Sequence, residues 1–215
     1  MLKLYTYFRS SAAFRVRIAL NYKQLPYQSI PVHLLRGGGE QHSATFAERN
    51  PARLVPVLED GALTLMQSLA IIEYLEETHP TPALLPRDAA ARATVRALAF
   101  SIACDIHPLN NTRVMRYLKS PLAIDDEARA EWSRHWIALG FGALERMLAQ
   151  GGTAGACCYG DAPTLADCCL IPQVFNAQRV NCPLEPYPTI RRIHEYCMRL
   201  EAFVRAAPGA QSDAE

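Results

Sequence analysis

Three short segments in the first third of the chain combine hydroxyl groups, backbone donors and proline in ways that suit anion or peptide binding. The first is Arg9-Ser10-Ser11, which lies between a predicted strand and a predicted helix. There a hydroxyl group and free N–H groups meet the positive end of the helix dipole, an arrangement that stabilises an anion. The alternative is that Ser10 only caps the helix.

The second and third segments flank a predicted hairpin. In Leu54-Val55-Pro56, a cis bond before the proline would turn the Val55 backbone outward to pair with an extended peptide, although most such bonds are trans. Gln67-Ser68 opens the helix after the hairpin. Its hydroxyl and first-turn amides could bind a carboxylate, or Ser68 could be an ordinary N-cap.

An alternation of short strands and helices must position these segments within residues 1–82. The predicted order is βαβαββα, that of a thioredoxin-like α/β domain, with Asp60-Gly61 as the hairpin turn because glycine readily adopts positive φ. The predicted strands are Leu2–Tyr7, Tyr27–Val32, Val55–Glu59 and Ala62–Leu65, and the predicted helices are Ala12–Tyr22, Ala44–Arg49 and Gln67–Thr78.

A second domain, all-helical, is predicted over residues 88–215. Pro80, Pro82 and Pro86 mark the linker before it, because proline removes a backbone donor and disfavours helix in the preceding residue. A capping box is predicted at Thr164 and Asp167, and the polar tail from Pro208 is expected to be mobile. The predicted helices are Ala91–Ala103, Ile124–Leu148, Leu165–Gln178 and Ile190–Ala202.

Composition argues against several classes of function. The chain has 215 residues, with 22 Lys and Arg against 21 Asp and Glu, so nothing indicates a nucleic-acid or anionic-membrane partner. The first residues, MLKLYTYFRSS, lack the apolar core and cleavage site of a secretory signal, and we expect a cytoplasmic protein. The seven cysteines form no CxxC pair, and they are interpreted as buried apolar residues with no metal site.

Together the three segments resemble, in order and spacing, the glutathione site of a glutathione-transferase N-terminal domain. Longer motifs resemble the zeta class of that family, and the resemblance extends from Leu4 to about Ala207. It implies the glutathione-transferase fold, an α/β thioredoxin-like N-terminal domain plus an all-α C-terminal domain. The motifs are YFRSSAAFRVRIAL, NPARLVPVL, QSLAIIEYLEETHPTPALLP, GDAPTLADCCLIPQV and PLEPYPTIRRI.

The resemblance also implies roles for individual residues, by position. Ser10 would hold the glutathione thiolate, and His107, a lone histidine in a helix, has a structural hydrogen-bonding role as its alternative. The residues implied to contact glutathione are Ser10, Gln41, His42, Val55, Gln67, Ser68, His107 and Asn111. Those implied in catalysis are Arg9, Ser10 and Ser11, and those implied to bind substrate carboxylates are Arg9, Arg113 and Arg179. Solvated helix faces are predicted for Arg17, Arg92 and Arg96.

Within the class, the chain is similar to the maleylacetoacetate and maleylpyruvate isomerases. This implies a homodimeric, glutathione-dependent cis–trans isomerase that converts maleylacetoacetate to fumarylacetoacetate in aromatic catabolism. Ala12 replaces the cysteine of the family's Ser-Ser-Cys pattern, which weakens transfer of any cysteine-dependent side activity. The alternatives are maleylpyruvate isomerisation, glutathione-dependent conjugation or dehalogenation of α-haloacids, and a non-enzymatic glutathione-transferase-like ligand carrier.

Overall fold

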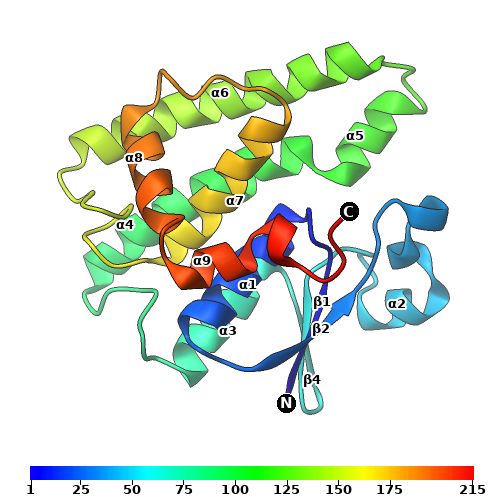
Figure 1. The fold of residues 1–215 in the computed structure, drawn as a ribbon, viewed down its shortest axis with the longest axis horizontal. Coiled ribbons are helices and arrows are strands. Elements are labelled where there is room, and N and C mark those ends of the chain that lie inside the picture. Colours follow the sequence, from blue (N-terminus) through cyan, green and yellow to red (C-terminus); the bar gives the residue numbers. More distant parts are fainter. The chain divides into compact units, whose positions relative to one another are not determined.

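A four-stranded mixed sheet organises the first part of the chain (Figure 1). In the computed structural model, which describes residues 1–215, the strands lie in the order β2–β1–β3–β4. The strands are β1 (Leu2–Thr6), β2 (Tyr27–Pro31), β3 (Val57–Asp60) and β4 (Leu63–Met66). The helices among them are α1 (Ser11–Tyr22), α2 (Ala44–Arg49) and α3 (Ser68–Thr78), so the predicted order βαβαββα is confirmed.

Two connections fix the sheet topology. β1 pairs in parallel with β2, and a parallel pair needs a crossover, which α1 provides. β1 pairs antiparallel with β3, and β3 with β4. The predicted hairpin is confirmed, with Asp60 opposite Leu63 and Gly61 at a φ of 58° in the turn.

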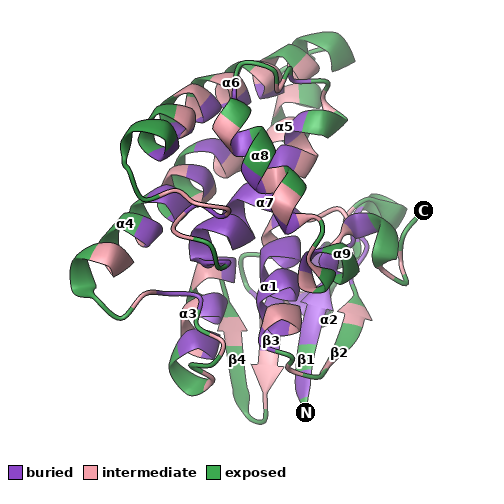
Figure 2. Ribbon diagram, turned by 60° about the vertical axis from the view of Figure 1, so that its left-hand side comes forward, coloured by how far each residue is buried: buried purple, intermediate pink, exposed green.

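One part of the core lies between the sheet and α1, and a second apolar cluster includes Tyr5, Phe46 of α2 and Val57. Leu4 in β1 and Leu58 in β3 are fully buried, whereas the edge strands β2 and β4 carry half-buried and exposed residues (Figure 2). α1 is buried over nearly its whole length and packs against α3. The end of β1 and the start of α1 are therefore both set by this core.

The C-terminal residues belong with the sheet. The chain divides into a sheet unit, residues 1–84 and 198–215, and a helical unit, residues 85–197. α9 (Glu201–Ala206) packs on α1, and Asn21 Nδ2 donates to the carbonyl of Ala202 at 3.2 Å. The structure thus differs from the predicted domain of residues 88–215, because α9 covers an apolar surface of α1 that the sheet alone leaves open.

The helical unit contains helices and loops, with one isolated β-bridge between Ala154 and Gly160. α7 lies at its centre, buried along most of its length and in contact with α4 and α8. The Thr164–Asp167 capping box is confirmed. The helices are α4 (Ala89–Phe100), η3 (Ser101–Ile106), η4 (His107–Asn110), α5 (Thr112–Lys119), α6 (Asp126–Gln150), α7 (Leu165–Arg179) and α8 (Pro188–Cys197).

Two predicted segments turn out differently. The single helix expected over Ile190–Ala202 is split into α8 and α9, which belong to different units. The tail beyond Pro208 is bonded rather than loose: Asp213 Oδ2 accepts from the Phe8 N–H at 3.1 Å, and Glu215 Oε1 lies 3.1 Å from His33 Nε2. A tail of small polar residues gives no sequence signal for such specific partners.

Six of the seven cysteines are buried in the helical unit, and Cys104 is exposed. Donor atoms of Cys157, Asp167 and Cys197 lie within 4.8 Å of one another. Asp167 is already engaged, since its oxygens accept from the N–H groups of Cys158 and Thr164, each at 2.8 Å. Burial raises the pKa of Asp167 and is the main cause of the raised pKa of the Cys158 thiol.

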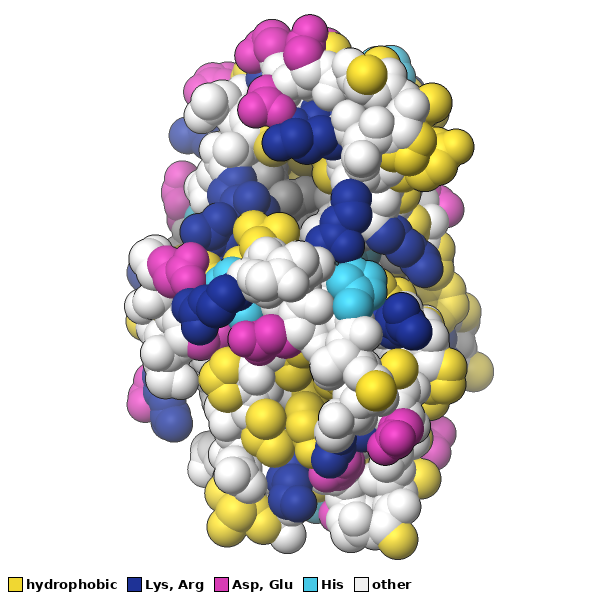
Figure 3. Space-filling model, turned by 90° about the vertical axis from the view of Figure 1, so that its right-hand side faces the viewer, with side chains coloured by type: hydrophobic (Ala, Val, Ile, Leu, Met, Phe, Trp, Pro, Cys, Tyr) yellow, Lys and Arg dark blue, Asp and Glu magenta, His cyan; other side chains and the backbone are white.

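None of the helices combines the length and apolar character needed to span a bilayer. Side chains of both signs of charge occur on the face drawn in Figure 3, as the near balance of 22 basic and 21 acidic residues implies.

Candidate functional site

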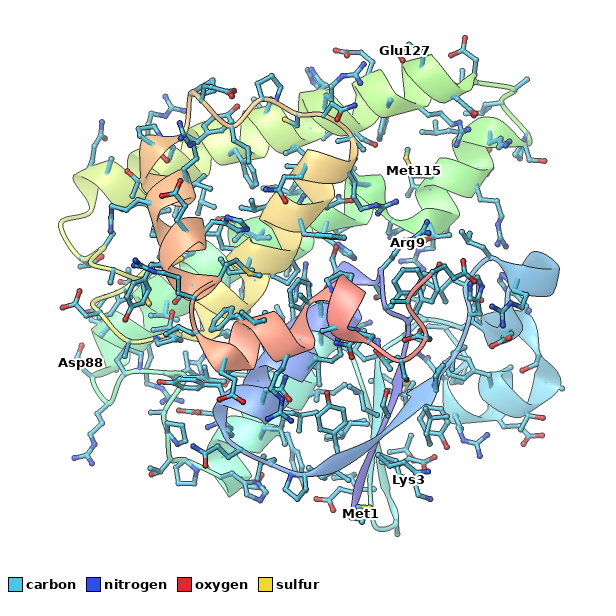
Figure 4. The ribbon with its side chains drawn as sticks, in the orientation of Figure 1. Met1, Lys3, Arg9, Asp88, Met115 and Glu127 are labelled. Carbon is cyan, nitrogen blue, oxygen red and sulfur yellow. The ribbon has the colours of Figure 1, made fainter.

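The turn between β1 and α1 presents Ser10 at the start of a buried helix. Arg9 lies beyond the end of β1 that is opposite Met1 (Figure 4), with its guanidinium carbon 4.8 Å from the centre of the Phe8 ring. Ser10 is the N-cap of α1, and its Oγ accepts from the Ala13 N–H at 3.2 Å. Capping uses Oγ as an acceptor, so the hydroxyl proton is left to donate to an anion at the positive end of α1. Both interpretations of Ser10 are therefore compatible.

Ser11 is placed differently from its neighbour. It is the first residue of α1 and is buried, whereas Ser10 is half-buried. A buried first-turn residue contributes its backbone N–H to the helix N-terminus whatever its side chain does. This makes Ser10 the more accessible of the two hydroxyls.

The Val55–Pro56 peptide bond is cis, as the expected geometry requires. Val55 is buried, and no hydrogen bond within the chain uses its backbone N–H or C=O. The preceding carbonyl, that of Leu54, is held by Asn50 Nδ2 at 2.7 Å. Val55 thus offers a donor and an acceptor to an extended backbone.

The start of α3 has an uncommon backbone. Gln67 adopts a φ of 70° and is the N-cap, but its side chain makes no capping hydrogen bond. Ser68 is the first helical residue rather than the N-cap, and its buried Oγ accepts from Arg15 Nη1 at 3.3 Å. With no side-chain cap, the first-turn amides of α3 can bind a carboxylate.

Gln41 and His42 lie in the short helix η2 (Glu40–His42), after three glycines with positive φ. Gln41 is buried, and its Nε2 donates to the Leu34 carbonyl at 3.3 Å, while its Oε1 has no partner. A Cβ at Gly39 would lie 2.5 Å from Gln41 Nε2, so glycine is required there for Gln41 to hold this position. His42 is exposed.

The site residues of the helical unit occupy two segments. His107 begins η4 and is half-buried, and the Asn111 side chain caps α5 by accepting from the N–H groups of Arg113 and Val114, both at 3.1 Å. Arg113 is exposed, as is Arg179, the last residue of α7. Their roles in binding stay predictions.

Two arginines of α1 were not expected in the interior. Arg17, predicted on a solvated face, is 0% exposed, and Arg15 is 2% exposed. Arg17 donates to Thr6 Oγ1 at 2.9 Å and to the carbonyls of Tyr7 and Phe8 at 3.2 and 2.9 Å. Burial lowers the pKa of Arg17 to about 10. A sequence signal existed: from Ala12 to Leu20 every residue other than the two arginines is apolar, so this stretch of α1 has no polar face for them.

Comparisons with known proteins identify the family. A family model described as "Glutathione S-transferase, N-terminal domain" matches residues 4–83. A structure titled as the holo form of "Maleyl Pyruvate Isomerase, a bacterial glutathione-s-transferase in Zeta class" superposes with a TM-score of 0.96 at 50% identity, covering 99% of this chain and 100% of that one. The chain belongs to the zeta class of glutathione S-transferases.

Two further relatives are similar over nearly their whole length. The "Probable maleylacetoacetate isomerase" of Vibrio cholerae is 54% identical over 211 residues, 98% of this chain and 97% of that protein. The maleylacetoacetate isomerase of Anaeromyxobacter dehalogenans, whose structure holds bound GSH in the active site, has a TM-score of 0.89 at 46% identity and covers 100% of this chain and 98% of its own.

Proposed function

We propose that this zeta-class chain is a glutathione-dependent cis–trans isomerase that converts maleylacetoacetate to fumarylacetoacetate. The observation that carries the proposal is the Ser10 hydroxyl at the N-terminus of α1, in a sheet unit that also offers the open Val55 backbone and the uncapped start of α3. Relatives named maleylacetoacetate isomerase, such as that of Vibrio cholerae at 54% identity, support it.

Glutathione is a tripeptide with a carboxylate at each end and an ammonium group on its γ-glutamyl residue, and the residues of the sheet unit fit its parts. Val55 would pair with the cysteinyl backbone through its N–H and C=O. Gln67 and Ser68 would bind the γ-glutamyl carboxylate at the start of α3. Gln41, whose buried Oε1 lacks a partner, or His42 beside it, would approach the glycyl end.

When bound, glutathione would supply a thiolate that adds reversibly to the cis double bond and, after rotation, leaves it trans. A free thiol with a pKa near 8.5 is only a few per cent ionised at neutral pH, and lowering that pKa by roughly two units takes about 2.7 kcal/mol. The Ser10 hydroxyl donates to the sulfur, and the α1 dipole adds to this stabilisation. Arg9, Arg113 and Arg179 would bind the substrate carboxylates.

Maleylpyruvate is a second candidate substrate. The "Maleylpyruvate isomerase" of a Ralstonia species is 50% identical over 213 residues, 99% of both chains. Its identity lies between that of the Vibrio cholerae relative, 54%, and that of the maleylacetoacetate isomerase of Mus musculus, 44%. Both substrates present a cis double bond between a carbonyl and a carboxylate, so one set of residues would serve either.

A side-by-side assay tests the proposal. Maleylacetoacetate and maleylpyruvate are each supplied with no glutathione and with glutathione at one hundredth of the substrate concentration, and free thiol is titrated throughout. We expect turnover only with glutathione, a larger kcat/KM for maleylacetoacetate and constant thiol. A larger kcat/KM for maleylpyruvate would reassign the substrate. A further reaction supplies an α-haloacid with glutathione, and loss of thiol in proportion to the haloacid consumed would indicate conjugation or dehalogenation. If none of these compounds is turned over, the protein would be a ligand carrier.

The assembly and location that we propose are a homodimer in the cytoplasm. The absence of any helix suited to span a bilayer is compatible with this placement. The aromatic catabolism of the family would supply the maleyl substrate there.

A further inference from the structure

Arg17 is a buried cation on α1 whose hydrogen bonds all go to neutral oxygens. Its Nε donates to the Ala206 carbonyl at 2.9 Å, Nη1 to Thr6 Oγ1 and the Tyr7 carbonyl, and Nη2 to the Phe8 carbonyl. The charge of Asp213 partly offsets the lowering of the Arg17 pKa by burial, but no hydrogen bond joins the two side chains. Burying this cation therefore still costs free energy that an apolar side chain of the same volume would not. Such a cost is expected where the side chain has a further task.

Two of the acceptors are consecutive carbonyls of the turn that leads to Ser10. The Tyr7 carbonyl accepts both from Arg17 Nη1 at 3.2 Å and from the Ser10 N–H at 2.9 Å. Arg17 therefore holds the same oxygen that fixes the Ser10 backbone. On the other side of the turn, the Phe8 N–H donates to Asp213 Oδ2 at 3.1 Å.

We propose that Arg17 is a positioning residue for Ser10, which it holds through the Tyr7 and Phe8 carbonyls in the orientation that binds the glutathione thiolate. This inference rests on the proposed function, since it concerns the same thiol. The alternative is a purely structural role, in which Arg17 only joins α1 to α9 through its hydrogen bond to the Ala206 carbonyl. The two differ in whether loss of the guanidinium changes the thiol as well as the fold.

The chain offers a matched control in Lys23, another buried cation of the sheet unit. Lys23 Nζ bonds to Glu76 Oε2 and to the carbonyls of His79 and Pro82, at 2.7, 2.7 and 2.8 Å. It lies at the opposite end of α1 from Ser10. Replacing it removes a buried cation without touching the Ser10 turn.

The test compares Arg17→Met, Arg17→Lys and Lys23→Met. Three quantities are measured: the pH midpoint of the bound glutathione thiolate by ultraviolet absorbance, the hydrogen-exchange rate of the Ser10 amide in ligand-free protein, and the thermal midpoint. We expect both Arg17 variants to raise the pH midpoint of the bound glutathione thiol. For Arg17→Lys the shift should be roughly half to one pH unit, which corresponds to the free energy of one hydrogen bond. Ser10 amide exchange should accelerate about tenfold in both. Lys23→Met should lower only the thermal midpoint.

Arg17→Lys keeps the charge and most of the volume, so it provides the answer if Arg17→Met does not fold. An unchanged thiol midpoint and unchanged Ser10 exchange in Arg17→Lys, with Ser10→Ala still moving the midpoint, would overturn the positioning role. If the wild-type protein itself neither binds glutathione nor lowers its thiol pKa, the proposed function fails instead. The exchange of the Ser10 amide then still decides whether Arg17 orders the turn.

Discussion

At the residue scale, the Ser10 hydroxyl group has two hydrogen-bonding roles. As an acceptor it caps α1 through the Ala13 N–H, and as a donor it is free to stabilise a thiolate. We expect Ser10→Ala to raise the pKa of bound glutathione by about one to two units, because a hydrogen bond to a charged group contributes about 1.5–3 kcal/mol. The thiolate absorbance measured against pH reports the shift.

Two further variants test whether the thiolate donor is Ser10. Ser10→Thr keeps the hydroxyl and should retain most of the thiol shift, and Ser11→Ala should leave it unchanged because Ser11 is a buried first-turn residue. Loss of the cap in Ser10→Ala should also lower the free energy of unfolding by about 1 kcal/mol. A thiol midpoint that moves in Ser11→Ala and stays constant in Ser10→Ala would assign the thiolate to the other serine.

Arg179 is the residue whose role is most open. It is exposed at the last position of α7, where the simple interpretation is a cation stabilised by the helix dipole. If it binds a substrate carboxylate, Arg179→Ala should raise the KM for the maleyl substrate by tens of fold, or roughly 1.5–3 kcal/mol. Arg179→Lys should raise the KM less than Arg179→Ala does, but it should not restore the wild-type value, since lysine lacks the paired donors of the guanidinium. Steady-state kinetics that match the wild type would leave substrate binding to Arg9 and Arg113.

At the element scale, the glycine loop before η2 sets the position of Gln41. Gly39→Ala would place a Cβ 2.5 Å from the Gln41 side chain, at a φ of 109° that alanine rarely adopts. We expect glutathione to bind roughly tenfold more weakly, a loss of about 1.4 kcal/mol. Calorimetry with γ-glutamylcysteine, which lacks the glycyl residue, should show little change.

Gly37→Ala is the control for backbone strain. Gly37 also has positive φ, 58°, but no atom lies within 4 Å of the position that a Cβ would take there. Gly37→Ala should destabilise the loop without changing the preference between the two ligands. An equal loss of affinity for both ligands in Gly39→Ala would contradict a glycyl-binding role for Gln41.

The elements of the sheet unit could be predicted because each has a local signal. Strand alternation, the Asp60-Gly61 turn and the apolar periodicity of α1 all depend on near neighbours in the chain. The helix-starting positions of Ser10 and Ser68 followed from the same signals. By contrast, Arg17 meets Ala206, and Phe8 meets Asp213, across nearly the whole sequence. No local pattern encodes the partners in such contacts, so the bonded tail and the α8–α9 division were missed. The burial of Arg17 did have a local signal, the apolar residues around it in α1, but its partner Ala206 did not.

At the scale of the whole molecule, the proposed homodimer predicts the mass of the protein in solution. In this class the N-terminal domain of one subunit is expected to pair with the helical domain of the other. Analytical ultracentrifugation at micromolar concentration should give about twice the mass of 23.9 kDa. A single species with the mass of one chain over that concentration range would contradict the dimer.

The cysteine distribution has a consequence for how unfolding can be timed. All seven thiols lie between residues 104 and 197, inside the helical unit, and the sheet unit has none. An alkylating reagent should therefore add one label quickly, at Cys104, and six more only when the helical unit opens. Intact mass against time then gives the opening rate of that unit alone, while hydrogen exchange of the amides of β1 and β3 follows the sheet unit. If the two rates are equal, the two units open together in one cooperative step. If the buried cysteines are labelled faster than the sheet unit opens, the helical unit opens first.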